Sequence, residues 1–314
     1  MGQLETVNMT TAETTPFGVS LASLKEVQSQ GLTAADPHQN ILYTAALNLT
    51  SSKYTLIGLS IDSGKIVFEM DLPYIVETFV GVGMYIDVTK NGDVIVTGRD
   101  AAVDLQHHVL RIDPKTKSVK SVATLGGIDI LGGSSTLSDD MLWLMLSVNN
   151  SGTMELELFS LNISSGKVNQ HQDSTYLESL SVDNKTGAIY GTGLRKTANS
   201  TVVRTLVKMD PSSGAQTVVA DIPGYFIMAA NVQALCPKGR KLFLLLQKGQ
   251  ASPAAASARL ADIVANPAAF AVPDADTSLH LVTLDIDSGK IDYSPKACAT
   301  LTDCPWTLEV AHAH

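Results

Sequence analysis

A pattern of alternating apolar residues that ends in Ile-Asp-Ser-Gly-Lys recurs along this chain. It is nearly the same in residues 56–65 and 281–290, and residues 158–167 are a close third copy. Looser copies surround Asp113-Pro-Lys-Thr-Lys117 and Asp210-Pro-Ser-Ser-Gly214. Each copy predicts a strand, a tight turn that needs a residue with positive φ, and a second strand.

The spacing of the copies indicates a repeat protein. Aligned on the turn residue, they are 53, 49, 48 and 75 residues apart, and the long step contains an Ala- and Pro-rich segment. A period of about 50 residues that contains strands is typical of propeller blades. Further short apolar strands precede each copy, so a unit has four strands. The turn residues are Gly64, Lys117, Gly166, Gly214 and Gly289.

We therefore predict an all-β chain in which a single β-propeller domain spans residues 1–314. Five full units run from about residue 31 to residue 296, and residues 4–8, 17–24 and 306–310 look like additional strands. Six four-stranded blades are the first prediction and five are the second. Packing the sheets face to face around an axis would bury both faces of each.

Residues 249–277 interrupt the fifth unit as an Ala- and Pro-rich insertion. Ser252 suits the N-cap of a helix and Pro253 its first position, and Leu260, Ile263 and Val264 would share one side. We expect a short amphipathic helix between the second and third strands of this unit.

Composition and motifs exclude several classes of function. A net charge of −9 argues against nucleic-acid binding, which depends on clustered Lys and Arg. The chain has no apolar run long enough for a membrane span. It contains no Gly-x-Ser-x-Gly elbow, Walker loop, dinucleotide fingerprint after a strand, or His-Glu-x-x-His motif. No enzyme class follows from these motifs.

Glycosylation signals and cysteines bear on the compartment. Cys298 and Cys304 are close enough in sequence to bridge in an oxidising compartment, which leaves Cys236 over. The first residues have neither a basic start nor an apolar stretch, so we expect no signal peptide there. A secreted glycoprotein is the interpretation, and a cytoplasmic protein is the alternative. Asn-x-Ser/Thr occurs at Asn8, Asn48, Asn149, Asn162, Asn184 and Asn199.

The topology of a four-stranded blade separates two faces of the ring. The repeated turns lie on one face, where Asp62, Asp113, Asp210 and Asp287 suit turn geometry by bonding the backbone. The other face carries the blade-to-blade connections, the insertion and the candidate functional residues, because loops on a rigid scaffold concentrate binding side chains. The candidates there are Tyr74, Tyr176 and Tyr225 for binding, and His107 and His108 for acid–base catalysis.

The pattern Leu-x-x-Leu-x-Ile-Asp-Ser-Gly-Lys followed by a strand resembles the blades of YVTN-, NHL- and lactonase-like propellers. The resemblance covers nearly the whole chain and marks architecture rather than an activity. Calcium-dependent lactonase-like propellers hold a metal in the channel with acidic and Asn side chains of inner strands. The resemblance therefore implies calcium, and the residues that match by type and place are Glu77, Asp129, Glu178, Asn231 and Glu309.

Two functions are consistent with these observations. The first is a non-enzymatic, extracellular propeller that binds a protein or glycan partner on the face bearing the insertion at 249–277. The second is a metal-dependent hydrolase or lyase that acts at the channel mouth, as lactonase-like propellers do. An enzyme would need at least three of the metal-ligand candidates to converge on one point, whereas a binding module needs only surface.

Overall fold

A computed structural model describes most of the chain. The described residues are 5–7, 14–16, 27–36, 38–48, 53–75, 85–99, 107–125, 134–138, 140–150, 153–171, 176–183, 185–199, 201–236, 238–252, 254, 271–273 and 279–298. No helix in this part of the chain is long and apolar enough to cross a membrane.

Five antiparallel sheets of four main strands follow one another along the chain. The first contains β3 (Val27–Asp36), β4 (Ile41–Asn48), β5 (Lys53–Ser60) and β6 (Ile66–Ile75). The second contains β7 (Tyr85–Val88), β8 (Val94–Arg99), β9 (His107–Asp113) and β10 (Ser118–Leu125). The third contains β11 (Ser134–Ser138), β12 (Met141–Asn150), β13 (Thr153–Asn162) and β14 (Val168–His171). The fourth contains β15 (Tyr176–Val182), β16 (Ile189–Lys196), β17 (Val202–Met209) and β18 (Gln216–Ile222).

The fifth sheet contains β19 (Tyr225–Cys236), β20 (Lys241–Ala251), β22 (Leu279–Asp285) and β23 (Ile291–Cys298). A short additional strand, β21 (Ala271–Pro273), pairs with the end of β20. The chain also forms a two-stranded sheet from β1 (Glu5–Val7) and β2 (Thr14–Pro16).

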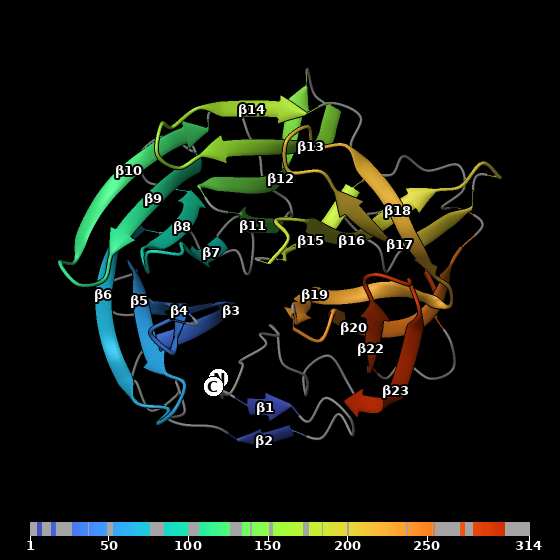
Figure 1. Cartoon of the computed structure of the whole chain (residues 1–314), viewed down its shortest axis with the longest axis horizontal. Helices are drawn as coiled ribbons and strands as arrows, with labels where there is room; N and C mark the ends of the chain where they lie inside the picture. The colour runs from blue at the N-terminus through green and yellow to red at the C-terminus, as the bar shows by residue number, and fades with distance from the viewer. Residues whose placement is uncertain are drawn as a thin grey trace.

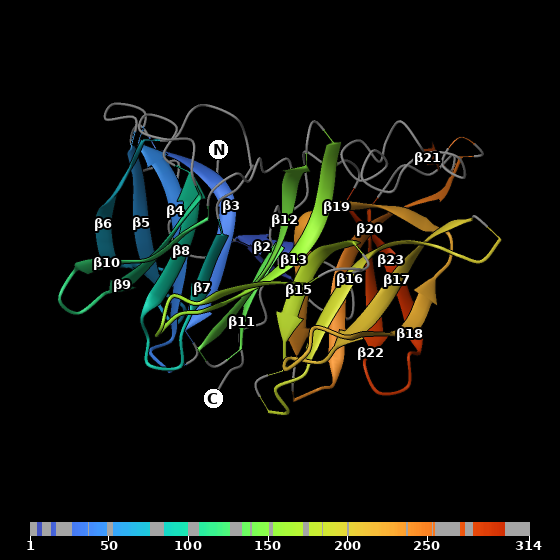
Figure 2. The ribbon, with the colours of Figure 1, turned by 90° about the horizontal axis from the view of Figure 1, so that it is seen from above.

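The five sheets are the blades of a β-propeller (Figure 1). The innermost strand of each blade contacts that of the next, from β3 through β7, β11 and β15 to β19. Figure 2 shows the strands running between the two faces of the ring. The first prediction, six blades, is wrong, and the second prediction of five is confirmed. Among the described residues, Figure 1 places the two-stranded β1–β2 sheet between the first and fifth blades.

The number of blades was mispredicted because terminal strands were counted toward a further blade. Residues 5–7 do form a strand, but it pairs with residues 14–16. The expected strands at 17–24 and 306–310 lie outside the described residues, as does most of the helix expected within 249–277. Hydrophobic alternation identifies a strand, but it does not identify the strand's partner.

The recurring turns have the backbone conformation that the sequence predicts. The residues with positive φ between the third and fourth strands of each blade are the five on which the repeats were aligned, with φ from 56° to 75°. Glycine adopts this left-handed conformation without steric cost. Lys117 is the one residue of the five that is not glycine, and it adopts the same conformation with φ of 56°.

Side-chain oxygens at the start of these turns accept hydrogen bonds from the turn backbone, as expected for Asp113 and Asp210. The amide of Lys115 donates to Asp113 Oδ1 at 2.8 Å, and the amide of Ser212 donates to Asp210 Oδ1 at 2.7 Å. These bonds lower the pKa of both carboxyls, together with hydrogen bonds from the hydroxyls of Thr116 and Ser212 respectively.

Asp62 and Asp287 have a different role, and the expectation for them was wrong. They come two residues later in their turns and reach across to the turn between the first and second strands of the same blade. Asp62 Oδ1 accepts a hydrogen bond from Asn40 Nδ2 at 2.5 Å. Asp287 accepts two from Arg240, at 2.9 Å from Nε and 2.6 Å from Nη2.

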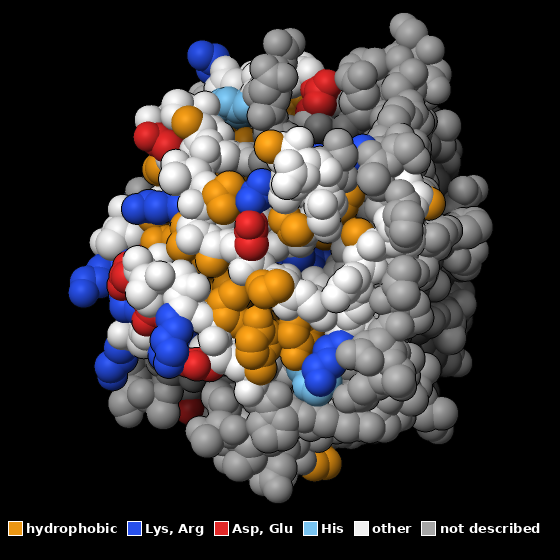
Figure 3. Space-filling model, turned by 90° about the vertical axis from the view of Figure 1, so that its right-hand side faces the viewer, with side chains coloured by type: hydrophobic (Ala, Val, Ile, Leu, Met, Phe, Trp, Pro, Cys, Tyr) orange, Lys and Arg blue, Asp and Glu red, His pale blue; other side chains and the backbone are white. Residues whose placement is uncertain are grey.

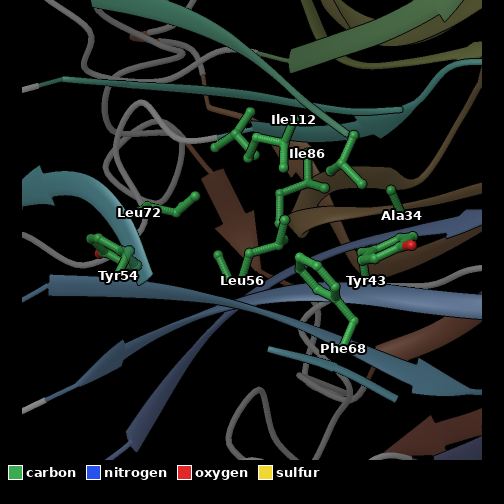
Figure 4. Close-up of a cluster of buried hydrophobic side chains, with 11 residues drawn as sticks. Ala34, Tyr43, Tyr54, Leu56, Phe68, Leu72, Ile86 and Ile112 are labelled. Carbon is green, nitrogen blue, oxygen red and sulfur yellow. The ribbon is translucent and has the colours of Figure 1, made fainter. Parts of the chain in front are cut away.

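The core consists of apolar layers between neighbouring blades. Figure 4 shows the layer between the first two blades, where Leu56 and Phe68 face Ile86 and Ile112. The ring of Tyr43 meets that of Phe68 edge-on, with centroids 6.0 Å apart. Burying a large apolar side chain contributes about 1.5–3 kcal/mol, so these layers are the main source of stability.

The recurring turns of the second, third and fifth blades also pack against the outer strand of the preceding blade. A Cβ on Gly166 would lie 2.8 Å from the carbonyl oxygen of Val122, and one on Gly289 would lie 3.1 Å from that of Val219. Lys117 Nζ donates to the carbonyl oxygen of Glu69 at 3.0 Å. The turn glycines therefore serve both the local conformation and the approach of one blade to another.

We predict that Gly166→Ala destabilises the fold more than Gly187→Ala. The two glycines have nearly equal φ, 72° and 73°, so both substitutions carry the strain of about 1–2 kcal/mol of a left-handed residue. Nothing lies within 4 Å of a Cβ on Gly187, whereas one on Gly166 meets backbone. Urea unfolding should show at least about 1 kcal/mol of additional loss for Gly166→Ala. Equal losses would contradict this seating.

A polar clamp joins the fourth and fifth blades on the face of the turns. Asp183, with a fully buried side chain, pairs with Arg240, which also binds the exposed Asp287. Burial acts to raise the pKa of Asp183, but hydrogen bonds from Thr186 and Arg240 outweigh it and hold this pKa below its ordinary value. A buried carboxylate needs such a partner because desolvation of a charge is costly.

We predict that Arg240→Met lowers the free energy of unfolding by about 2 kcal/mol at pH 7, because it leaves Asp183 buried without its cation. The loss should shrink as pH falls toward 4, since protonation removes the uncompensated charge. Arg195→Met is the matched control. Arg195 is equally exposed, at 27% against 26%, but its partner Asp221 is 43% exposed. A similar, pH-independent loss in both variants would contradict the clamp.

Candidate functional site

The two candidate catalytic histidines are consecutive residues of β9. His108 is partly buried, and its Nδ1 lies 3.3 Å from the hydroxyl oxygen of Thr124 on β10. The register pairs His107 with Leu125 on that strand. Among the described residues, no group of three His, Cys, Asp or Glu side chains could hold a metal ion at these histidines or elsewhere.

The five metal-ligand candidates divide into two groups. Glu178 lies on β15, where the register is interrupted between Leu177 and Ser179, and Asn231 lies on β19 within a longer interruption. The remaining three lie outside the described residues, so metal binding by these five stays a prediction. These three are Glu77, Asp129 and Glu309.

Of the three binding candidates, Tyr225 occupies a defined environment. Tyr74 is near the end of β6 and Tyr176 begins β15. The ring of Tyr225 stacks on that of Tyr293, with centroids 5.0 Å apart and planes 11° from parallel. It meets the ring of His280 edge-on at 5.9 Å. We call Tyr225, His280 and Tyr293 the Tyr225 cluster.

Burial within the Tyr225 cluster is uneven. Tyr225 and His280 are only 6% and 7% exposed, whereas Tyr293 is 45% exposed. Partial burial raises the pKa of the Tyr293 hydroxyl, so this group stays protonated at neutral pH. The buried ring of Tyr225, which itself contacts His280, thus supports the half-exposed ring of Tyr293.

The backbone places the Tyr225 cluster beside the insertion. Gly224, with φ of 78°, turns the chain into β19, and its carbonyl oxygen accepts a hydrogen bond from the amide of Gly249 at 3.0 Å. Gly249 is the first residue of the insertion at 249–277. Strand β22 begins just after the insertion ends, and His280 is the second residue of β22. The cluster therefore lies where the connection between two blades meets both ends of the insertion.

The cluster adjoins an apolar layer, and Lys248 pairs in register with Tyr225. Tyr225 belongs to the layer between the fourth and fifth blades, together with Ile222. Arg204 on β17 pairs in register with Ile222 and is 1% exposed. The flank formed by the outer strands of these blades faces the viewer in Figure 3, where hydrophobic side chains gather among basic ones. This combination suits a partner that presents an apolar or aromatic group.

An unusual carboxyl lies on the inner strand of the second blade. Asp87 accepts a hydrogen bond from the amide of Val88 at 3.0 Å. Burial raises the pKa of this carboxyl to about 7, although the backbone N–H groups of Val88 and Leu137 act to lower it. Leu137 belongs to β11 of the third blade, so Asp87 joins two inner strands. A carboxyl that titrates near neutral pH suits acid–base chemistry.

We predict that Asp87 makes the protein less stable as pH rises from 4 to 7. The unfolded chain loses this proton near pH 4, whereas the native state keeps it until about pH 7, so the unfolded state is favoured across this interval. The effect is about 4 kcal/mol at most. Urea unfolding of Asp87→Asn should show a flatter dependence on pH than the parent protein. Parallel pH profiles would contradict the raised pKa.

Sequence reasoning named Tyr225 as a binding candidate but did not name His280 or Tyr293. No motif marks either residue, because His280 follows the insertion and Tyr293 sits in an outer strand that otherwise looks like part of the repeat. Tyr225 and Tyr293 lie on the first and fourth strands of their sheet and pair with different neighbours. Only the folded blade brings them together.

No family model matches this chain, and no curated protein matches its sequence. Among solved structures it is similar to the apocarotenoid oxygenase of Synechocystis in a variant form, with 12% identity, 95% of this chain and 68% of that chain covered, and a TM-score of 0.52. It is also similar to a chain of a nidogen–laminin complex, with 10% identity, 93% and 90% coverage, and a TM-score of 0.53.

A third similar structure is the β-propeller domain of the Trilobed protease from Pyrococcus furiosus. The identity is 9%, the coverage 89% of this chain and 73% of that chain, and the TM-score 0.51. These likenesses show the fold. The chain is a β-propeller. At such identities they carry no activity over, and the printed descriptions differ: an oxygenase, a complex with laminin and a domain of a protease.

Proposed function

We propose that this propeller is a binding protein that recognises a protein partner on the face bearing the insertion at 249–277. The observation that supports the proposal is the Tyr225 cluster, in which the half-exposed Tyr293 stacks on the buried Tyr225 and Tyr225 in turn contacts His280. Tyrosines of this kind concentrate binding energy at interfaces, because they bury a large area at a low cost in conformational entropy.

The position of the cluster supports a binding role. Tyr225 and His280 both lie at junctions with connections between strands, and such connections vary on a propeller while the sheets stay constant. The likeness to a chain of the nidogen–laminin complex supports the scaffold only, and shows that this fold occurs in a protein assembly. A glycan that stacks on Tyr293 is the alternative occupant of the same surface.

We predict that Tyr293→Ala strongly weakens partner binding while Tyr293→Phe retains it. Phenylalanine keeps the stacked ring, whereas alanine removes it. Affinity of an isolated partner, measured by calorimetry, should fall about 30-fold or more in the alanine variant, as for an interface hot spot. Val67→Ala, an exposed apolar site on the first blade, is the control. Equal capture by all variants would sink this surface as the binding site.

An enzymatic function is the second candidate, favoured by one observation. Asp87 lies on an inner strand with a pKa near neutral pH, which suits an acid–base group in a propeller hydrolase or lyase. Stoichiometric calcium in the purified protein, with a melting temperature that falls on chelation, would support this function over binding. A protein that contains no metal, and whose melting temperature does not change with a chelator, would exclude a metal-dependent enzyme.

We place the protein in the secretory pathway as part of the same proposal. The six glycosylation signals and the spacing of Cys298 and Cys304 support this placement. A protein that binds outside the cell is consistent with both features. Fractionation of the organism that produces the protein, with detection in the medium or in secretory compartments, tests the placement directly.

A further inference from the structure

The structure separates the six Asn-x-Ser/Thr signals by environment. Asn48 ends β4 and Asn149 lies within β12, so the backbones of both are committed to sheet pairing. Asn8 and Asn184 lie outside the described residues. The side chains of Asn162, the last residue of β13, and of Asn199, in a turn, are described, and their surroundings differ.

Asn162 is part of the framework of the third blade. Its Oδ1 accepts hydrogen bonds from the amide and the hydroxyl of Ser165, both at 2.8 Å. The hydroxyl of Ser164, the third residue of this signal, donates to Asp140 Oδ2 at 2.9 Å. The turn also contains the buried Ile163 and the glycine that seats against Val122. The Asn162 side chain and the Ser164 hydroxyl, which are the two groups that N-glycosylation requires, are therefore both hydrogen-bonded within the protein.

Asn199 lies instead at the tip of the β16–β17 hairpin, outside any strand. The hairpin is closed by the amide of Thr197, which donates to the carbonyl oxygen of Thr201 at 2.8 Å, and by the amide of Thr201, which donates to Thr197 Oγ1 at 3.2 Å. Asn199 and Thr201 are both exposed. These bonds use the backbone of Thr201 and leave the Asn199 side chain at the surface.

We propose that Asn199 is an N-glycosylation site and that the signal at Asn162 is not used. Nδ2 of Asn199 would bond to the anomeric carbon of an oligosaccharide carried on a lipid pyrophosphate. The bond from that carbon to the pyrophosphate oxygen breaks, the lipid pyrophosphate leaves with the electron pair, and the amide loses one proton. The Thr201 hydroxyl is the recognition group at the third position of the signal.

This inference rests on the proposed secretory placement, because the glycosyl donor is available only there. The hairpin is a connection between second and third strands, so the glycan would stand on the same face of the ring as the insertion. Figures 1 and 2 place the β16–β17 hairpin at the outer edge of the ring. A bulky polar glycan at that edge is compatible with the packing between blades.

The test is expression of the full chain behind a secretion leader in a eukaryotic cell, followed by peptide mapping with and without peptide N-glycosidase. We expect the Asn199 peptide to carry glycan that the enzyme removes, leaving aspartate. Asn199→Gln and Thr201→Ala should each abolish that glycan, whereas Thr201→Ser, which keeps a hydroxyl, should retain it. Asn162→Gln should leave the glycan pattern unchanged.

An unmodified Asn199 peptide in secreted, folded protein would overturn the proposal, as would a glycan at Asn162. A melting curve of the secreted Asn199→Gln variant that matches the parent shows that loss of the glycan does not reflect misfolding. Because the leader forces secretion, this experiment tests the acceptor site alone. If Asn199 carries glycan in this system but not in protein isolated from its own source, the secretory placement is contradicted, whereas Asn199 is still supported as an acceptor site.

Discussion

The seating of a turn from one blade on the outer strand of the blade before it is the contact on which the ring depends. Gly166 approaches the carbonyl of Val122, and Gly289 approaches that of Val219. A single sheet has two apolar faces and buries them only if its neighbours come close along their whole width. Apolar layers such as that in Figure 4 form between the blades because these turns allow the outer edges to meet as closely as the inner ones.

The junction between the fourth and fifth blades contains several polar contacts between side chains. Gln233 on β19 accepts a hydrogen bond from the Thr192 hydroxyl at 2.6 Å and donates one to the Ser181 hydroxyl oxygen at 2.8 Å. The Asp183–Arg240 pair closes the same junction on the turn face. Buried polar groups that are fully paired define a unique geometry. The Tyr225 cluster therefore lies at a junction whose geometry is closely specified, which suits a binding surface.

The sequence was sufficient for the fold class and for the turns, because those depend on local patterns. Gly64 and its equivalents show positive φ as expected, and each lies between two paired strands. The number of blades was not predictable, because the sequence of residues 5–7 is compatible with several partners. In the structure these residues pair with residues 14–16. Tyr225 was identified as a candidate, but the stacking of Tyr293 on it was not, since those residues are 68 positions apart (293 − 225).

By itself, the sequence determined a chain of repeated four-stranded units, the residues that turn left-handed, and the face on which variable connections collect. Each of these follows from hydrophobic period and from the φ preference of glycine, which act within a few residues. Only the tertiary structure decided which side chains meet across blades: Arg240 with Asp183, Tyr293 with Tyr225, and the exposed Asn199 as distinct from the engaged Asn162. Such contacts depend on how sheets twist and pack around the axis, and no local pattern encodes that geometry.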